Sequence, residues 1–165
     1  MTRKRRTEEE LRKASDHLHY EYWMLHSTAA GLESGIADQV LLKNALIESF
    51  VVHVRAMIDF LYPNGPKNDA VIAADYFRAQ GEWEKLRPDQ SEILKKAKKR
   101  ADKEIAHLTY ARQYVSKEKK GWHCLKISHE IQGITDIFLS NIDKNKLGDR
   151  WNSPEKMVGS AHPTR

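Results

Sequence analysis

Hydrophobic residues recur every three or four positions through four long stretches of this chain, which is the spacing of amphipathic α-helices. The first stretch opens at Thr7, which together with Glu10 has the spacing of a capping box. The glycines at 31 and 35 offer a stop signal for it. The predicted helices run from 7 to 31 or 35, from 38 to 62, from 88 or 89 to about 115, and from the polar break at 117–121 to about 141.

The second stretch differs from the others because apolar residues surround most of its circumference, which predicts a central and nearly buried helix. Its remaining polar residues fall within a stripe of roughly 60° on a helical projection. We call these four residues the polar seam: Asn44, Glu48, Arg55 and Asp59. Two interpretations stand. In the first, the seam residues pair with one another or face solvent. In the second, the seam faces a groove and pairs with residues of another helix, such as Arg100, Lys103 and Glu104.

Between the second and third helices the chain is irregular, with proline and glycine breakers from Pro63 to Pro88. A short helical piece is predicted at 70–77. Three aromatic residues, Tyr76, Phe77 and Trp83, are expected to fold back over the bundle as a lid.

Length and patterning together predict one all-α domain, a bundle of four main helices with a short helical insert. A chain of 165 residues is long enough for one domain with a real core and short for two. We therefore expect a single domain over 1–165, with its core at about 7–142. A basic N-terminus, Thr2 to Arg6, precedes this core, and a loose polar tail is expected from Asp143 onward.

Composition and charge add little to this prediction of the fold. The net charge of +5 is partly concentrated in the N-terminal run, so charge alone does not argue for nucleic acid. A single cysteine, Cys124, cannot form an internal disulfide and fits a reducing cytoplasm. The basic N-terminus has no apolar stretch behind it, so neither a signal peptide nor a membrane association is expected.

The candidate chemistry lies on the third helix, where Arg100 and His107 are seven residues apart. At about 100° per residue, seven steps return to within roughly 20° of the start, so the two side chains share one stripe. A guanidinium holds a phosphate and stabilises its developing charge, and an imidazole moves a proton to or from a hydroxyl. Metal-free RNA cleavage needs little more, although the same two residues also suit the solvated edge of a packed helix.

Other catalytic classes have weaker support in the sequence. Di-iron bundles repeat a Glu-x-x-His pair on two helices. Glu104 and His107 form one such pair and no second copy follows, so no metal and no cofactor are predicted. Cys124 beside His123 lacks a third positioned group, and neither a phosphate-binding glycine loop nor a serine elbow is present.

Two segments resemble the HEPN superfamily, compact all-helical domains with an Arg, four to six residues and then a His on a later helix. The segments are RADKEIAHLTY, which contains Arg100 and His107, and ALIESFVVHVRAMIDFLYP, which is followed by DYF. As an order of helices the resemblance spans roughly Leu11 to Phe138.

The resemblance implies a metal-independent endoribonuclease, of toxin or phage-defence type, in which two protomers bring their Arg/His sets into one cleft. By that analogy Arg100 orients the scissile phosphate, and His107 is the acid/base or a phosphate contact. The expected partners are RNA or a nucleotide, a second copy of the chain, and a protein such as an antitoxin. Residues expected to contact substrate are Lys103, Glu104, Tyr110, Glu48 and Arg55.

Ala101 stands where many active members of that superfamily carry a polar residue, and Asp102 comes one position later. This departure favours an alternative, a non-catalytic HEPN-like module that binds nucleotide, RNA or a partner protein.

Overall fold

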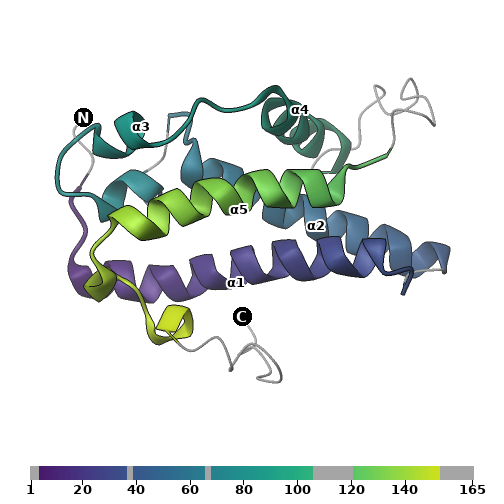
Figure 1. Cartoon of the computed structure of the whole chain (residues 1–165), viewed down its shortest axis with the longest axis horizontal. Coiled ribbons are helices and arrows are strands. Elements are labelled where there is room, and N and C mark those ends of the chain that lie inside the picture. The colour runs from purple at the N-terminus through teal and green to yellow at the C-terminus, as the bar shows by residue number, and fades with distance from the viewer. Residues whose placement is uncertain (1–3, 37–38, 66–67, 106–120, 153–165) are drawn as a thin grey trace.

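The computed structural model is an all-α bundle, as predicted, and it describes residues 4–36, 39–65, 68–105 and 121–152. Within those ranges the chain has no strand. Four main helices form the bundle and a short one, α3, lies in the insert between the second and third of them (Figure 1). The helices are α1 (Glu8–Glu33), α2 (Val40–Leu61), α3 (Glu82–Leu86), α4 (Glu92–Arg100) and α5 (Cys124–Asn141).

Local capping fixes where two of these helices begin. The Thr7 hydroxyl accepts a hydrogen bond from the Glu10 amide at 3.2 Å, and the Glu10 carboxylate accepts one from the Thr7 amide at 2.8 Å. This is the predicted capping box. The start of α4 was predicted at 88 or 89, but Ser91 is its N-cap and accepts a hydrogen bond from the Leu94 amide.

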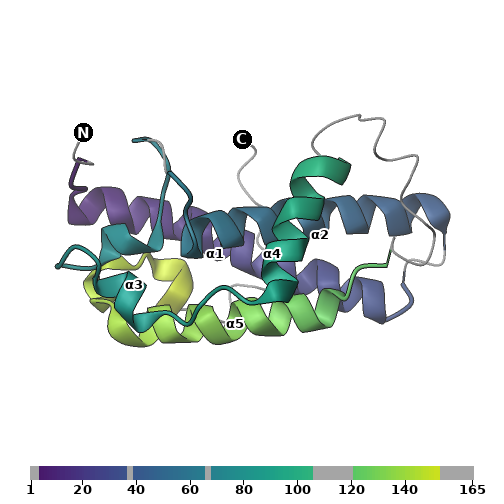
Figure 2. The ribbon, with the colours of Figure 1, turned by 90° about the horizontal axis from the view of Figure 1, so that it is seen from above.

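Helix α2 is central only in its second half, so the prediction of a nearly buried helix is wrong for its first turns. Phe50, Val54 and Met57 are fully buried, whereas Val40 and Leu41 are 75% and 82% exposed. Figure 2 shows the reason, because the first turns of α2 extend beyond the start of α5. Apolar sequence alone therefore does not bury these first turns, over which none of the described helices lies.

The aromatic residues of the insert form part of the core and do not merely cover it. Trp83 is fully buried and Tyr76 is 1% exposed. The Trp83 indole N–H donates to the Leu61 carbonyl at 2.8 Å, and the Tyr76 hydroxyl donates to the Leu11 carbonyl at 3.0 Å. The predicted helical piece at 70–77 is a 3₁₀ turn, Ala73–Tyr76. These bonds attach the insert to α1 and α2.

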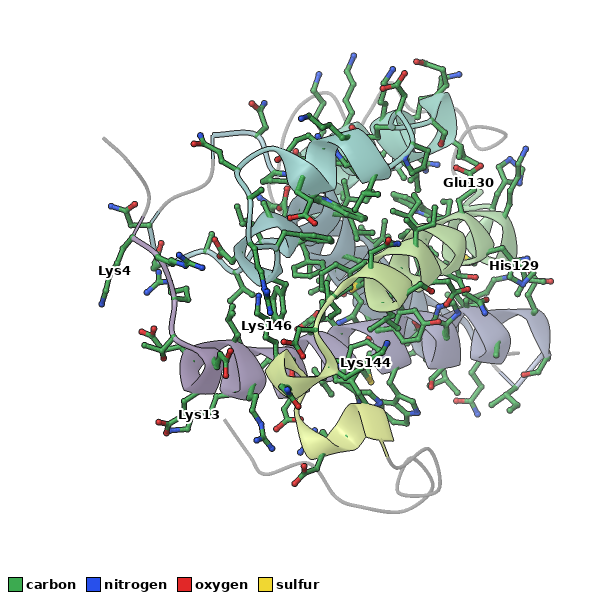
Figure 3. The ribbon with its side chains drawn as sticks, turned by 60° about the vertical axis from the view of Figure 1, so that its left-hand side comes forward. Lys4, Lys13, His129, Glu130, Lys144 and Lys146 are labelled. Atoms are coloured by element: carbon green, nitrogen blue, oxygen red, sulfur yellow. The ribbon has the colours of Figure 1, made fainter. Side chains whose placement is uncertain are left out.

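Residues 143–152, which we call the C-terminal strap, pack on α1, so the expectation of a loose tail from Asp143 is wrong up to residue 152. Two 3₁₀ turns form the strap, Lys144–Lys146 and Asp149–Asn152. The Gly148 amide donates to the buried Ser15 hydroxyl at 2.7 Å, and the Lys146 ammonium donates to the Tyr76 carbonyl. Figure 3 shows Lys144 and Lys146 where the strap meets α1.

None of the helices in the described part of the chain is both long and apolar enough to cross a membrane.

Candidate anion-binding groove

Helix α4 ends in a wide helical turn at the position of the candidate motif. Its α-helical part stops at Arg100, and Ala101–Ile105 form a π-helical turn. A π turn contains more residues than an α turn and often marks a functional site. The α-helical spacing that aligned Arg100 with His107 therefore does not hold through this segment.

A groove lies between α4 and the residues that lead into α5. Three of its cationic side chains, Lys96, Lys99 and Arg100, come from one face of α4, because positions i, i+3 and i+4 are neighbours on a helix. The other lining residues are Ile93, Ala97, Gly121, Trp122, His123 and Ile127. None of these described lining residues carries a carboxylate. The groove therefore combines an apolar floor with a basic rim.

Arg100 is held in place by the segment that precedes α5. Its guanidinium carbon lies 4.2 Å from the centroid of the Trp122 ring, and its Nη1 donates to the Gly121 carbonyl at 2.9 Å. The Trp122 ring in turn meets Phe50 of α2 edge-on, with ring centroids 6.5 Å apart. These contacts place the positive charge of Arg100 at a defined position in the groove.

The polar seam of α2 divides into two halves: Asn44 and Glu48 are exposed, whereas Arg55 and Asp59 form the predicted internal pair and also reach α4 and the π turn. Arg55 Nε lies 2.9 Å from Asp102 Oδ1 and 3.8 Å from Asp59 Oδ2, and Asp59 also pairs with Lys98 of α4. Asp102 Oδ1 is buried and has no hydrogen-bond partner, so its contact with Arg55 is an ion pair. Arg55 and Asp59 therefore join α2 to α4 and the π turn, while the contacts of Arg100 include Gly121 and Trp122.

The described part of the chain contains only some of the predicted site residues. His107 and Tyr110 lie outside it, as does the side chain of Glu104. Lys103 and Glu48 are exposed, and neither lines the groove. Arg55 is half exposed and belongs to the ion pairs that join α2 to α4. Arg100 is thus the predicted residue that the structure places in a concave site.

Sequence reasoning missed Lys96, Lys99 and Trp122 as site residues, and it considered His123 only as a neighbour of Cys124. The lysines carried a usable signal, since they share a helical face with Arg100. Trp122 carried none, because its approach to Arg100 depends on how the chain returns from α4 to α5.

Cys124 is not an activated nucleophile. The residue is 4% exposed, and burial raises the pKa of its thiol to about 11. The thiol therefore stays protonated near neutral pH. Within the ranges that the structure describes, no three His, Cys, Asp or Glu side chains are grouped so as to hold a metal ion.

Comparisons of this chain with protein-family models, with curated proteins and with solved structures found no match.

Proposed function

We propose that this chain is a HEPN-like, metal-independent endoribonuclease, of toxin or phage-defence type, that uses Arg100 and His107. The observation that supports the proposal is the position of Arg100 in a groove whose rim is basic and whose described lining residues include no carboxylate. Lysine and arginine side chains in that arrangement attract the phosphates of a nucleic acid backbone. The order of helices and the Arg-x-x-x-x-x-x-His spacing supply the link to cleavage.

In this proposal Arg100 binds the scissile phosphate. A guanidinium has several N–H donors, so it can bond to the Gly121 carbonyl and contact a phosphate at the same time. Stacking on Trp122 holds the guanidinium plane, so less side-chain entropy is lost when phosphate binds. Positive charge fixed beside the phosphate stabilises the negative charge that develops during transfer.

His107 supplies the proton transfers. As a general base it takes the proton from a ribose 2'-hydroxyl, whose oxygen attacks the adjacent phosphorus, and an acid then returns a proton to the leaving 5'-oxygen. The bond from phosphorus to that 5'-oxygen breaks, which leaves a 2',3'-cyclic phosphate. Two protomers that pair through their motifs would bring two Arg/His sets to one substrate, and an antitoxin would act by covering them.

A non-catalytic module that binds RNA, a nucleotide or a protein is the second candidate. Ala101 favours it, because the motif then lacks the polar residue that follows the arginine in many active members. The packing of Arg100 against Trp122 also suits a residue that binds without taking part in chemistry. In this case the groove would hold its ligand unchanged.

The deciding experiment is incubation of the purified chain with RNA in excess EDTA. We expect cleavage by the native protein and loss of cleavage in His107→Ala, with an unchanged far-UV circular dichroism spectrum. The matched control is His129→Ala, since His129 is an exposed histidine that does not line the groove. RNA that is bound but stays intact in EDTA supports the binding module. Cleavage that survives His107→Ala contradicts the catalytic assignment.

A further inference from the structure

We infer that the groove between α4 and α5 is a subsite for one unstacked base of single-stranded RNA, with the neighbouring phosphates of the strand bound by Lys96, Lys99 and Arg100. The inference rests on the proposed function only in taking RNA as the natural source of the nucleotide. The groove itself indicates a ligand with two parts: a planar, apolar part and an anionic part.

The floor of the groove provides the apolar side. Ala97 and Ile127 are each 3% exposed and belong to the core, and Ile93 packs against that core. A phosphate ion alone gains nothing from such a surface, because it would lose water there without forming a hydrogen bond. A nucleobase gains from it, since its faces are apolar and can be removed from water.

Trp122 and Arg100 provide a flat surface at the edge of this floor. Unpaired bases stack on aromatic side chains and on guanidinium planes. Here the guanidinium already lies over the indole at 4.2 Å, and Phe50 supports the indole edge-on. The surface is therefore formed before a ligand arrives, and ordering it costs the ligand little binding energy.

The charge of this groove separates it from the two other described grooves. One of those, along the first turns of α1 and the C-terminal strap, has four carboxylates: Glu8, Glu9, Asp16 and Asp149. The other, between α1 and the insert, has three: Glu10, Asp69 and Asp75. Each of these two grooves also has two cationic side chains, so its charges are mixed, whereas the groove beside Arg100 presents lysine and arginine alone among its charged lining residues.

A base reaches this floor only when it is unpaired. In an A-form duplex the base faces are stacked on their neighbours and the edges are paired, so stacking on Trp122 or Arg100 requires a single strand, a loop or a bulge. The groove therefore favours single-stranded RNA as the substrate class. A uniformly paired duplex would contact only the cationic side chains, through its phosphates.

The test compares ligands by isothermal titration calorimetry on the full chain. The ligands are uridine 5'-monophosphate, adenosine 5'-monophosphate, ribose 5-phosphate and inorganic phosphate. We expect the nucleotides to bind about tenfold more tightly than ribose 5-phosphate, because stacking of one base contributes on the order of 1–3 kcal/mol. Equal binding of nucleotide and ribose 5-phosphate overturns the base subsite, and this comparison needs no variant.

Variants then locate the subsite. Trp122→Leu should remove the preference for nucleotide over ribose 5-phosphate, and Trp122→Phe should restore it. Lys96→Gln should weaken both ligands, whereas Lys95→Gln is the matched control, since Lys95 pairs with Glu92 and does not line the groove. A preference unchanged in a folded Trp122→Leu protein overturns the inference. Nucleotide binding without RNA cleavage in EDTA contradicts the proposed function alone, and cleavage without nucleotide preference contradicts the subsite alone.

Discussion

Neutralising two lysines of the groove should change how strongly RNA binding depends on salt. The groove has three cationic side chains from α4, and each phosphate that is neutralised releases a counterion. For single strands the logarithm of affinity falls with the logarithm of salt at about 0.7 per contact, so three contacts predict a slope of about −2.1. The double variant Lys96→Gln, Lys99→Gln keeps only Arg100, for which the predicted slope is about −0.7.

The difference is measurable by fluorescence anisotropy with a labelled oligouridylate at pH 8. A fourfold rise in potassium chloride should weaken the native protein about 18-fold and the double variant about 2.6-fold. Lys95→Gln removes a neighbouring lysine that is paired with Glu92, so it should keep the native slope. Equal slopes for the native protein and the double variant would show that these lysines do not contact phosphate.

Four further predictions concern stability and reactivity. Burial, with a contribution from His129, lowers the pKa of His26 in the folded chain below its ordinary value of 6.5. As the pH falls, the unfolded chain therefore binds this proton before the folded chain does, and the free energy of unfolding should decline below pH 6.5. Urea unfolding of His26→Phe should show a shallower decline, and an unchanged pH dependence would contradict this. Native Cys124 should not react with a thiol reagent at pH 8 until the protein unfolds, and rapid labelling of folded protein would contradict its burial. Gly133→Ala has open space within α5 and should stabilise the chain by about 0.5–1 kcal/mol, whereas Ser15→Ala should cost about 1–3 kcal/mol, both measured by urea unfolding. A loss of stability in Gly133→Ala would contradict the open space beside Gly133, and no loss in Ser15→Ala would contradict the hydrogen bond from the Gly148 amide to Ser15.

The sequence predicts the helices well because their periodicity and caps are local. The capping box at Thr7 and the end of α5 near Asn141 both depend on residues within one or two turns. Burial was predicted less well, because it depends on which neighbours arrive. Leu41 has the same apolar character as Phe50, yet Leu41 is 82% exposed whereas Phe50 is fully buried with its ring against Trp122.

The groove contains one residue that the sequence singled out, Arg100, and several that it did not. Arg100 could be found from its spacing to His107, but the stacking partner Trp122 is 22 positions away along the chain. Similarly, the strap residues around Gly148 look like a polar tail until the buried Ser15 hydroxyl is seen to accept a bond from that amide. Contacts between distant segments leave no periodic trace in the sequence.

The ends of the RNA products test the central claim most directly. The chain is incubated with a short single-stranded RNA in EDTA, and the fragments are weighed by mass spectrometry. Attack by the neighbouring 2'-hydroxyl, with His107 as base and Arg100 on the phosphate, predicts fragments that end in a 2',3'-cyclic phosphate and a 5'-hydroxyl. Intact RNA, or fragments that carry a 5'-phosphate and a 3'-hydroxyl, would contradict the account.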